Sequence, residues 1–221
     1  MHYLAHEEEG DNMDTHGHLE VICGPMFSGK TEELIRRIRR VEYARMRAIV
    51  FKPYIDDRYS KDQVVSHSAQ KLDSIPVADS ANIRSYLGKV AKPFHVIGLD
   101  EVHFFDAAIV DLCEDLVASG VRVIAAGLCE DYKGAPFGPM PLLLTHADMI
   151  SKLFAVCMRC GRPASKSQRV NRQATEQTED QLLVGAALHY EARCRSCFKS
   201  TVVTLSDAEI KADVDLVRAH V

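Results

Sequence analysis

The chain has 221 residues, of which 47% are hydrophobic and 26% are charged, and this composition is typical of a soluble globular protein. Its length allows one large domain, or one domain with a small module beside it. The formal net charge of -4 argues against a protein that coats a long nucleic acid, because such binding needs an excess of clustered Lys and Arg. No apolar run reaches about 18 residues, and the first residues are polar and acidic. We therefore expect neither a transmembrane helix nor a secretory signal, and we expect the protein to be cytoplasmic.

The first predicted elements are a flexible tail, a strand and a helix. Residues 1–18 contain irregularly spaced histidines among acids with no apolar period, which indicates a flexible tail rather than a metal site. Leu19–Cys23 is a short apolar run that ends at a glycine, as a buried strand does. The stretch 34–41 places Leu, Ile, Ile and Val at helical spacing, whereas its four arginines face elsewhere. We interpret these arginines as a solvated helix face, given the acidic balance of the whole chain.

Between residues 48 and 128, apolar strands alternate with helical segments. Residues 48–51 are the second predicted strand, and the polar stretch after them is a long loop of the kind that often carries function. A helix is expected from about 82 to 90, followed by the apolar strand FHVIGLDE. AAIVDLCEDLVA is again helical and is closed by Gly120, and VRVIAAGL is typical of a strand buried on both faces. This alternation predicts an α/β fold with a parallel sheet.

The character of the sequence changes at about residue 153, where a small loop-rich module begins. Two stretches, FAVCMRCGRPASKSQRV and LLVGAALHYEARCRSCF, flank a polar patch near residues 173–181. The last residues, from 206 to 220, have the pattern of a terminal helix. We therefore expect a tail at 1–18, a main α/β domain at 19–152, a small domain at 153–205 and a C-terminal helix or tail at 206–221.

A phosphate-binding loop is predicted between the first strand and the first helix. The stretch GPMFSGKT matches G-x-x-x-x-G-K-[ST] and has the strand before it and the helix after it that the motif requires. The glycines permit a tight wrap with inward backbone N–H groups, and the helix N-terminus adds partial positive charge. The lysine would reach the β and γ phosphates of a nucleotide, and the threonine hydroxyl would help to hold magnesium. The predicted nucleotide ligands are Gly24, Pro25, Met26, Phe27, Ser28, Gly29, Lys30 and Thr31.

An acidic partner for this loop is predicted at the end of the strand HVIGLDE. A phosphate loop of this class works with an acid at the end of another strand, which holds magnesium directly or through water. Asp100 ends the apolar run and is the natural magnesium partner, together with Thr31. Glu101 would face whatever attacks the γ phosphate. We assign the run Asp100, Glu101, Val102 and His103 to the nucleotide site.

Two Cys-x-x-Cys pairs predict a metal site in the small module. Of the seven cysteines, four form these pairs, and an odd total favours metal over disulfides in a reducing compartment. Four thiolates suit a tetrahedral zinc that has no open position for catalysis, so the zinc would be structural; a redox role is the alternative for either pair alone. The predicted ligands are Cys157, Cys160, Cys194 and Cys197, whereas Cys23, Cys113 and Cys129 are expected in the core or in a wall.

Taken together, these motifs resemble the type II thymidine kinases, the zinc-containing kinases of the cytosol and of bacteria. The resemblance runs from about residue 19 to 198 through GPMFSGKT, DDRYS, SH, GLDEVHFF, PFG and the two cysteine pairs. It implies a RecA-like P-loop kinase domain with a zinc-ribbon-like lasso domain. It also implies transfer of phosphate from ATP to the 5′ hydroxyl of thymidine, with Glu101 as the general base and Lys30 stabilising charge, as the chemistry itself requires.

The same resemblance implies where the acceptor binds. Asp56 and Arg58 match residues near the sugar and the phosphates, with Asp57 as an alternative for the acid. Phe104, Tyr132 and Phe137 match an aromatic wall around the base, and Met26 would border the nucleoside. A lasso loop between the cysteine pairs would cover the base and read it through backbone groups near Val184 and Gly185 and on to Tyr190. Homotetramers and feedback inhibition by dTTP are further implications.

The chain departs from the family at several positions. A glutamine is common where His103 stands, and protonation of this histidine would add a pH dependence. Residues 186–189 lack the polar character often seen in the lasso, so deoxyuridine is expected as an acceptor beside thymidine.

Two other classes of function fit the sequence less well than a nucleoside kinase does. A zinc-bearing P-loop ATPase that acts on DNA is opposed by the acidic charge and by the absence of a basic strip with interleaved aromatics. A nucleotide-binding regulator without turnover would leave Glu101 idle.

Overall fold

The computed structural model describes residues 16–54, 63–65, 71–91, 93–171 and 189–204. The helices are α1 (Lys30–Tyr43), α2 (Ser80–Leu87), α3 (Ile109–Ala118) and α4 (Met140–His146), with a 3-10 turn η1 (Val102–Phe104). The strands of the main sheet are β1 (Leu19–Cys23), β2 (Ala48–Pro53), β5 (Ile75–Val77), β6 (Val96–Leu99), β7 (Arg122–Gly127) and β8 (Met149–Lys152). The other strands are β3 (Gln63–Val65), β4 (Lys71–Asp73), β9 (Ala155–Val156), β10 (Pro163–Ala164), β11 (Lys166–Asn171), β12 (Tyr190–Arg193) and β13 (Val203–Thr204).

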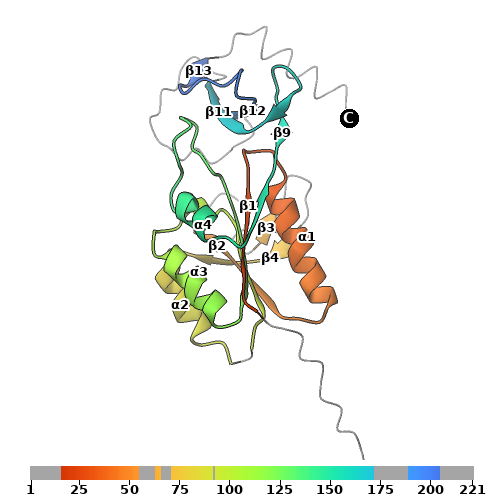
Figure 1. The fold of residues 1–221 in the computed structure, drawn as a ribbon, viewed down its shortest axis with the longest axis vertical. Helices are drawn as coiled ribbons and strands as arrows, with labels where there is room; N and C mark the ends of the chain where they lie inside the picture. The colour runs from red at the N-terminus through yellow and green to blue at the C-terminus, as the bar shows by residue number, and fades with distance from the viewer. Residues whose placement is uncertain (1–15, 55–62, 66–70, 92, 172–188, 205–221) are drawn as a thin grey trace, which may run out of the picture.

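The main sheet has six strands in the order β5-β2-β6-β7-β1-β8, and every neighbouring pair is parallel. This arrangement confirms the predicted α/β class. Cys23, at the end of β1, lies beside Gly127 of β7 on one side and Lys152 of β8 on the other. The carboxyl ends of these strands therefore meet at one edge of the sheet, where Figure 1 places the small module of β9 to β13.

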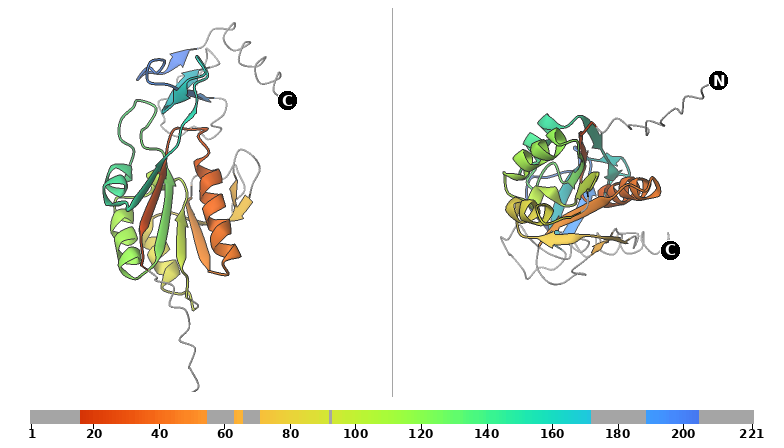
Figure 2. Two further views of the ribbon diagram at one scale, coloured as in Figure 1. Left: turned by 45° about the vertical axis from the view of Figure 1, so that its right-hand side comes forward. Right: turned by 90° about the horizontal axis from the view of Figure 1, so that it is seen from below.

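Helices cover both faces of the sheet, as Figures 1 and 2 show. On one face, the apolar side of α1 buries Leu34, Ile35 and Ile38 against side chains of β1, β2, β6 and β7. The other face carries α2, α3 and α4, which bury residues such as Ile83, Leu112 and Leu143 in a larger cluster. Helices thus shield both faces of the inner strands β1, β6 and β7 from water, which is why these strands read as continuous apolar runs.

The helices predicted within residues 34–118 are present, with shifted ends, whereas the terminal helix predicted at 206–220 lies outside the described residues. The helix expected at 82–90 is α2, which begins at Ser80 because Asp79 caps it by accepting a 2.8 Å hydrogen bond from the Asn82 N–H, and which ends at Leu87. In α3, the closing role of Gly120 is confirmed: its φ is 83° and its N–H donates to the Val117 carbonyl. Helix α4 was not anticipated.

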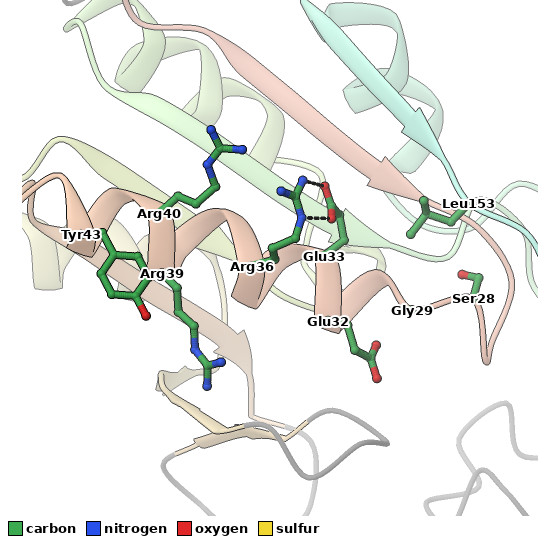
Figure 3. A pocket seen from close by; sticks show the side chains of 9 residues that line it. All are labelled: Ser28, Gly29, Glu32, Glu33, Arg36, Arg39, Arg40, Tyr43 and Leu153. Carbon is green, nitrogen blue, oxygen red and sulfur yellow. Dashed lines mark hydrogen bonds and ion pairs between the residues drawn. The ribbon is translucent and has the colours of Figure 1, made fainter.

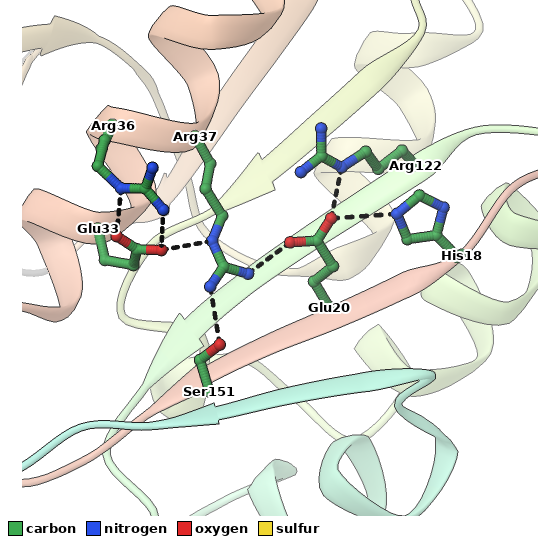
Figure 4. A network of polar contacts seen from close by, with 7 residues as sticks. All are labelled: His18, Glu20, Glu33, Arg36, Arg37, Arg122 and Ser151. Atoms are coloured by element: carbon green, nitrogen blue, oxygen red, sulfur yellow. Dashed lines mark hydrogen bonds and ion pairs between the residues drawn. The ribbon is translucent and has the colours of Figure 1, made fainter.

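A buried ion-pair network ties α1 to the sheet (Figure 4). Glu20 of β1 is 1% exposed and accepts hydrogen bonds from Arg37 of α1 and Arg122 of β7. Arg37 also donates to Glu33 at 2.8 Å and to the Ser151 hydroxyl of β8 at 2.8 Å. This network fixes α1, and with it the loop at its N-terminus, over three adjacent strands.

The small module is built from a β9–β10 hairpin and a three-stranded sheet in the order β12-β11-β13. Strands β11 and β12 are antiparallel, with Arg169 opposite Tyr190. The two strands that flank the segment 172–188 in sequence are therefore neighbours in this sheet. Within the described part of the chain, no helix combines the length and the apolar character that crossing a bilayer requires.

Candidate functional site

The loop GPMFSGKT joins β1 to α1 and depends on its two glycines. Gly29 is the residue before the helix and has a left-handed φ of 81°, which favours glycine. A Cβ at Gly24 would lie 2.6 Å from the Leu153 carbonyl oxygen and 2.7 Å from the Ser28 Oγ. The Ser28 hydroxyl in turn donates to the Pro25 carbonyl at 2.8 Å. The wrap that the motif predicts is therefore formed, with the backbone packed too closely at Gly24 for a side chain.

Lys30 opens α1 and is buried. Its Nζ donates to the Pro25 carbonyl at 2.8 Å, so the ammonium group rests on its own loop. Burial lowers the pKa of Lys30, while the carboxyl groups of Glu101 and Asp100 act to raise it. These interactions show that the lysine and both acids share one electrostatic environment, and the lysine would leave Pro25 to meet an anion.

The two acids follow β6 directly. Asp100 is 6% exposed, and its N–H donates to the Phe51 carbonyl of β2 at 2.9 Å. Burial and the neighbouring charge of Glu101 raise the pKa of Asp100 to about 7. The side chain of Glu101 is 44% exposed, and its backbone has a left-handed φ of 49°. A buried acid and a more accessible one thus stand side by side, which suits a cation ligand and a proton acceptor.

Val102 and His103 turn inward after these acids, in η1. Val102 belongs to the main core cluster. His103 is 1% exposed, and its Nδ1 accepts a 3.1 Å hydrogen bond from the Leu128 N–H. Burial, together with the charge of Lys30, holds the pKa of His103 well below its usual range. The ring is therefore neutral at neutral pH, and the pH dependence suggested for it from sequence is not expected.

The aromatic residues expected in one wall form two groups. The rings of Phe104 and Phe137 meet edge to face with centroids 5.3 Å apart, and the His103 ring lies 4.1 Å from the first and 4.6 Å from the second. Tyr132 instead lies against the Arg169 guanidinium, 5.3 Å from its ring centroid, and Tyr190 is opposite Arg169 on the neighbouring strand. Asp56, Asp57, Arg58, Val184 and Gly185 lie outside the described residues.

The phosphate loop is attached to the small module. The Met26 N–H donates to the Ser167 hydroxyl of β11 at 3.0 Å. The side chain of Phe27, assigned from sequence to the nucleotide, packs against the buried cluster of Ala155, Cys157, Ala164, Ala192 and Cys194. Sequence analysis missed Ser167 because it is 141 residues away along the chain and belongs to no motif. The small module therefore borders the loop.

The four paired cysteines come together as candidate metal ligands. Their Sγ atoms all lie within 4.8 Å of one another. The Sγ of Cys160 is 3.6 Å from that of Cys194 and 3.7 Å from that of Cys197, and tetrahedral bonds of about 2.3 Å to zinc would separate two sulfurs by about 3.8 Å. The Arg162 guanidinium donates to Cys160 and lowers its pKa to about 6. The donor set thus fits a metal that takes four thiolates.

A pocket of about 520 Å³ opens beside the phosphate loop. Ser28 and Gly29 line one end, and the lining continues along α1 through Arg36 and Arg40 to Tyr43, as Figure 3 shows. Tyr43 is 85% exposed. Of the four arginines predicted to form a solvated face, Arg36, Arg39 and Arg40 line this hollow. The prediction is wrong for Arg37, whose side chain is 12% exposed and is paired with Glu20.

A family model described as thymidine kinase matches residues 17–198. Thymidine kinases of Bacteroides fragilis strain YCH46 and Bacteroides thetaiotaomicron are each 48% identical to this chain, over 83% and 82% of it and 87% of their own lengths. Among solved structures, the genome packaging NTPase B204 of Sulfolobus turreted icosahedral virus 2 covers 63% of this chain and 75% of its own, at 18% identity and a TM-score of 0.42. From the family match and the Bacteroides relatives, the chain belongs to the thymidine kinase family.

Proposed function

We propose that this protein transfers the γ phosphoryl group of ATP to the 5′ hydroxyl of thymidine, giving dTMP and ADP, in pyrimidine deoxynucleotide salvage. Deoxyuridine is a second acceptor. The observation that carries the proposal is the 48% identity of this chain, over 83% of its length, to a protein named thymidine kinase. The buried Lys30 of the loop GPMFSGKT lies within electrostatic reach of Asp100 and Glu101, which act to raise its pKa.

The loop from Gly24 to Thr31 holds the phosphates of ATP through its backbone N–H groups and the N-terminus of α1. Thr31 and Asp100 hold Mg²⁺, which neutralises charge on the phosphates. The buried carboxyl group of Asp100 fits this role, because burial and the charge of Glu101 raise its pKa to about 7 although Lys30 and Lys52 act to lower it, and a bound cation would offset this cost of burying a carboxylate. Lys30 leaves the Pro25 carbonyl and stabilises the charge on the transferring group.

Glu101 acts as the general base. A phosphoryl transfer of this kind needs positioning and charge stabilisation, with a carboxylate to accept the proton of the attacking hydroxyl. Glu101 adjoins the buried Asp100 in sequence, yet its side chain is 44% exposed, so an acceptor can reach it. Val102 and His103 are the remaining residues that we assign to the nucleotide site, and the side chain of Val102 belongs to the hydrophobic core.

The nucleoside lies between the two aromatic groups and the small module. Met26 borders it from the phosphate loop, and Phe104 and Phe137 pack against the base from the side of His103. Tyr132 and Tyr190 bound it on the other side, near Arg169. Asp56 and Arg58 contact the sugar and phosphates, and the lasso backbone at Val184 and Gly185 reads the base.

Zinc at Cys157, Cys160, Cys194 and Cys197 has a structural role. The first pair lies in the turn between β9 and β10 and the second follows β12, so one metal would tie together parts of the chain that come before and after the segment 172–188. Because four protein ligands leave no open position, the metal shapes the lasso and takes no part in the chemistry. Family membership also supports a cytoplasmic homotetramer that is inhibited by dTTP.

The function is tested by ADP release in a coupled assay. With MgATP at moderate salt, thymidine should stimulate ADP release strongly and deoxyuridine detectably, whereas single-stranded DNA should not. Stimulation by DNA without stimulation by thymidine would replace the kinase with the DNA-directed ATPase that was weighed from the sequence. Chromatography of the thymidine reaction should show dTMP in amounts equal to ADP.

A further inference from the structure

One buried nitrogen of the candidate site has no role so far. His103 Nε2 and the Ser74 hydroxyl are the buried side-chain polar atoms in the described part of the chain that lack a hydrogen-bond partner. An unsatisfied buried donor costs about 1–3 kcal/mol, and such groups are rare in folded proteins. The side chain of His103 is fully buried, and its Nε2 lies 3.4 Å from the Glu101 Oε2.

The hydrogen bonding of the other ring nitrogen fixes the tautomer of His103. Because Nδ1 accepts the Leu128 N–H at 3.1 Å, Nδ1 carries no proton and the neutral ring must carry its proton on Nε2. The Nε2–H is therefore a donor without a hydrogen-bond partner in this structure, and a carboxylate oxygen of Glu101 lies 3.4 Å from Nε2.

The ring of His103 has little freedom to turn away. A Cβ at Gly127 of β7 would lie only 3.1 Å from Nδ1, so the strand passes directly beside the ring. The rings of Phe104 and Phe137 lie against it at 4.1 and 4.6 Å. A donor held this firmly can define the position of a more mobile partner, and the partly exposed Glu101 is such a partner.

We propose that His103 is a positioning residue for Glu101: its Nε2–H donates to the Glu101 Oε2 and holds the second carboxylate oxygen toward the acceptor hydroxyl. This inference rests on the proposed function, in which Glu101 is the base. In this structure the two atoms are 3.4 Å apart without the geometry of a hydrogen bond, so the carboxylate has to come closer and into line with the N–H to reach the usual 2.7–3.2 Å range for N–H···O. Catalysis is sensitive at this scale, because a base displaced by about 1 Å can lose about 100-fold in rate.

Two amide substitutions separate the two hydrogen bonds of the ring. The Oδ1 of asparagine is as many bonds from Cα as the histidine Nδ1, so His103→Asn keeps an acceptor for Leu128 but cannot reach Glu101. The Nε2 of glutamine is as many bonds from Cα as the histidine Nε2, so His103→Gln restores the donor to Glu101. His103→Asn therefore tests the hydrogen bond to Glu101, and His103→Gln tests the hydrogen bond from Leu128.

The test measures kcat and KM for thymidine, with saturating MgATP, in wild type, both His103 variants, Glu101→Gln and the double variant Glu101→Gln/His103→Asn. We expect His103→Asn to lower kcat about 10- to 100-fold with KM within about threefold, and His103→Gln to keep kcat within about threefold. In the double variant, His103→Asn should add nothing to the loss caused by Glu101→Gln.

The thermal midpoint and MgATP affinity of each variant separate positioning from folding. A structural role would make rate follow stability, whereas positioning predicts a stable but slow His103→Asn and an active His103→Gln. Wild-type kcat in His103→Asn, or equal losses in both His103 variants, overturns the inference while a slow Glu101→Gln leaves the proposed function standing. Wild-type kcat in Glu101→Gln overturns the base role itself, and the inference with it.

Discussion

The substitution Glu20→Gln tests how α1, which begins at Lys30, is held on the sheet. Glu20 is 1% exposed and is the carboxylate to which both Arg37 and Arg122 donate. Glutamine has nearly the same shape and keeps one acceptor oxygen, but it removes the negative charge. Arg37, 12% exposed, would then retain Glu33 as its acidic partner, and Arg122, 31% exposed, would lose the charge of Glu20.

The expected loss is about 3 kcal/mol of unfolding free energy. Removing one partner of a buried ion pair costs about 3–5 kcal/mol, and the lower end applies because Arg37 keeps Glu33 and Arg122 is partly hydrated. For a chain of this size, about 1 kcal/mol corresponds to about 2–4 °C. The thermal midpoint should therefore fall by about 6–12 °C at neutral pH.

The assay is urea unfolding followed by far-UV circular dichroism at one protein concentration, with thermal melting beside it. Asp115→Asn is the matched control, because Asp115 and its partner Arg84 are 62% and 56% exposed and such a pair is worth about 1 kcal/mol or less. If Glu20→Gln were no more destabilising than Asp115→Asn, the network would not be what holds α1, and the reasoning from burial would be refuted.

Three further predictions concern stability in acid, the packing of Gly138 against η1, and the metal. Hydrogen bonds from Arg36 and Arg37 lower the pKa of Glu33 to about 2, below its unfolded value near 4.5, so its stabilising effect is complete above about pH 4.5 and is lost as the pH falls toward 2; Glu33→Gln should flatten the fall of the urea midpoint between pH 5 and pH 3, and an unchanged fall would exclude Glu33 as its source. A Cβ at Gly138 would lie 2.2 Å from the His103 carbonyl oxygen, whereas Gly161 also has a left-handed φ but nothing within 4 Å; Gly138→Ala should therefore lose more stability than the roughly 1–2 kcal/mol expected of Gly161→Ala and should also lower kcat, and equal effects on melting and rate would contradict the packing argument. Elemental analysis should find one zinc per chain, and its removal by a chelator should lower the thermal midpoint; a zinc-free protein that is equally stable and active would contradict a structural site.

The sequence predicts the core of the fold because its signals are local. The runs at β1, β6 and β7 are continuous and apolar, as strands buried on both faces must be, and α1 has a clear apolar stripe. Strand β8 was missed because it is a four-residue edge strand whose residues are mostly exposed, so it has no apolar run. Helix α4 was missed because prolines precede and interrupt its short apolar stretch.

For the site, too, the sequence predicts local motifs but not contacts between segments that are distant along the chain. The phosphate loop, the two acids and the cysteine pairs are short motifs, and the structure brings the four paired cysteines together. The bond from Met26 to Ser167, the place of Phe27 against the small module and the bond from Leu128 to His103 all join segments distant in sequence. Spacing along the chain carries no signal for such contacts, because they arise only when the strands are brought side by side.

The most direct test of the account follows radiolabelled γ phosphate from ATP into thymidine, in wild type and in Glu101→Gln. The account predicts labelled dTMP from the wild type, and a loss of at least about 100-fold in kcat for the variant, with MgATP affinity unchanged within about threefold. Label that remains in free phosphate would contradict phosphoryl transfer to the nucleoside. Wild-type turnover by Glu101→Gln would show that the proton of the acceptor hydroxyl goes elsewhere.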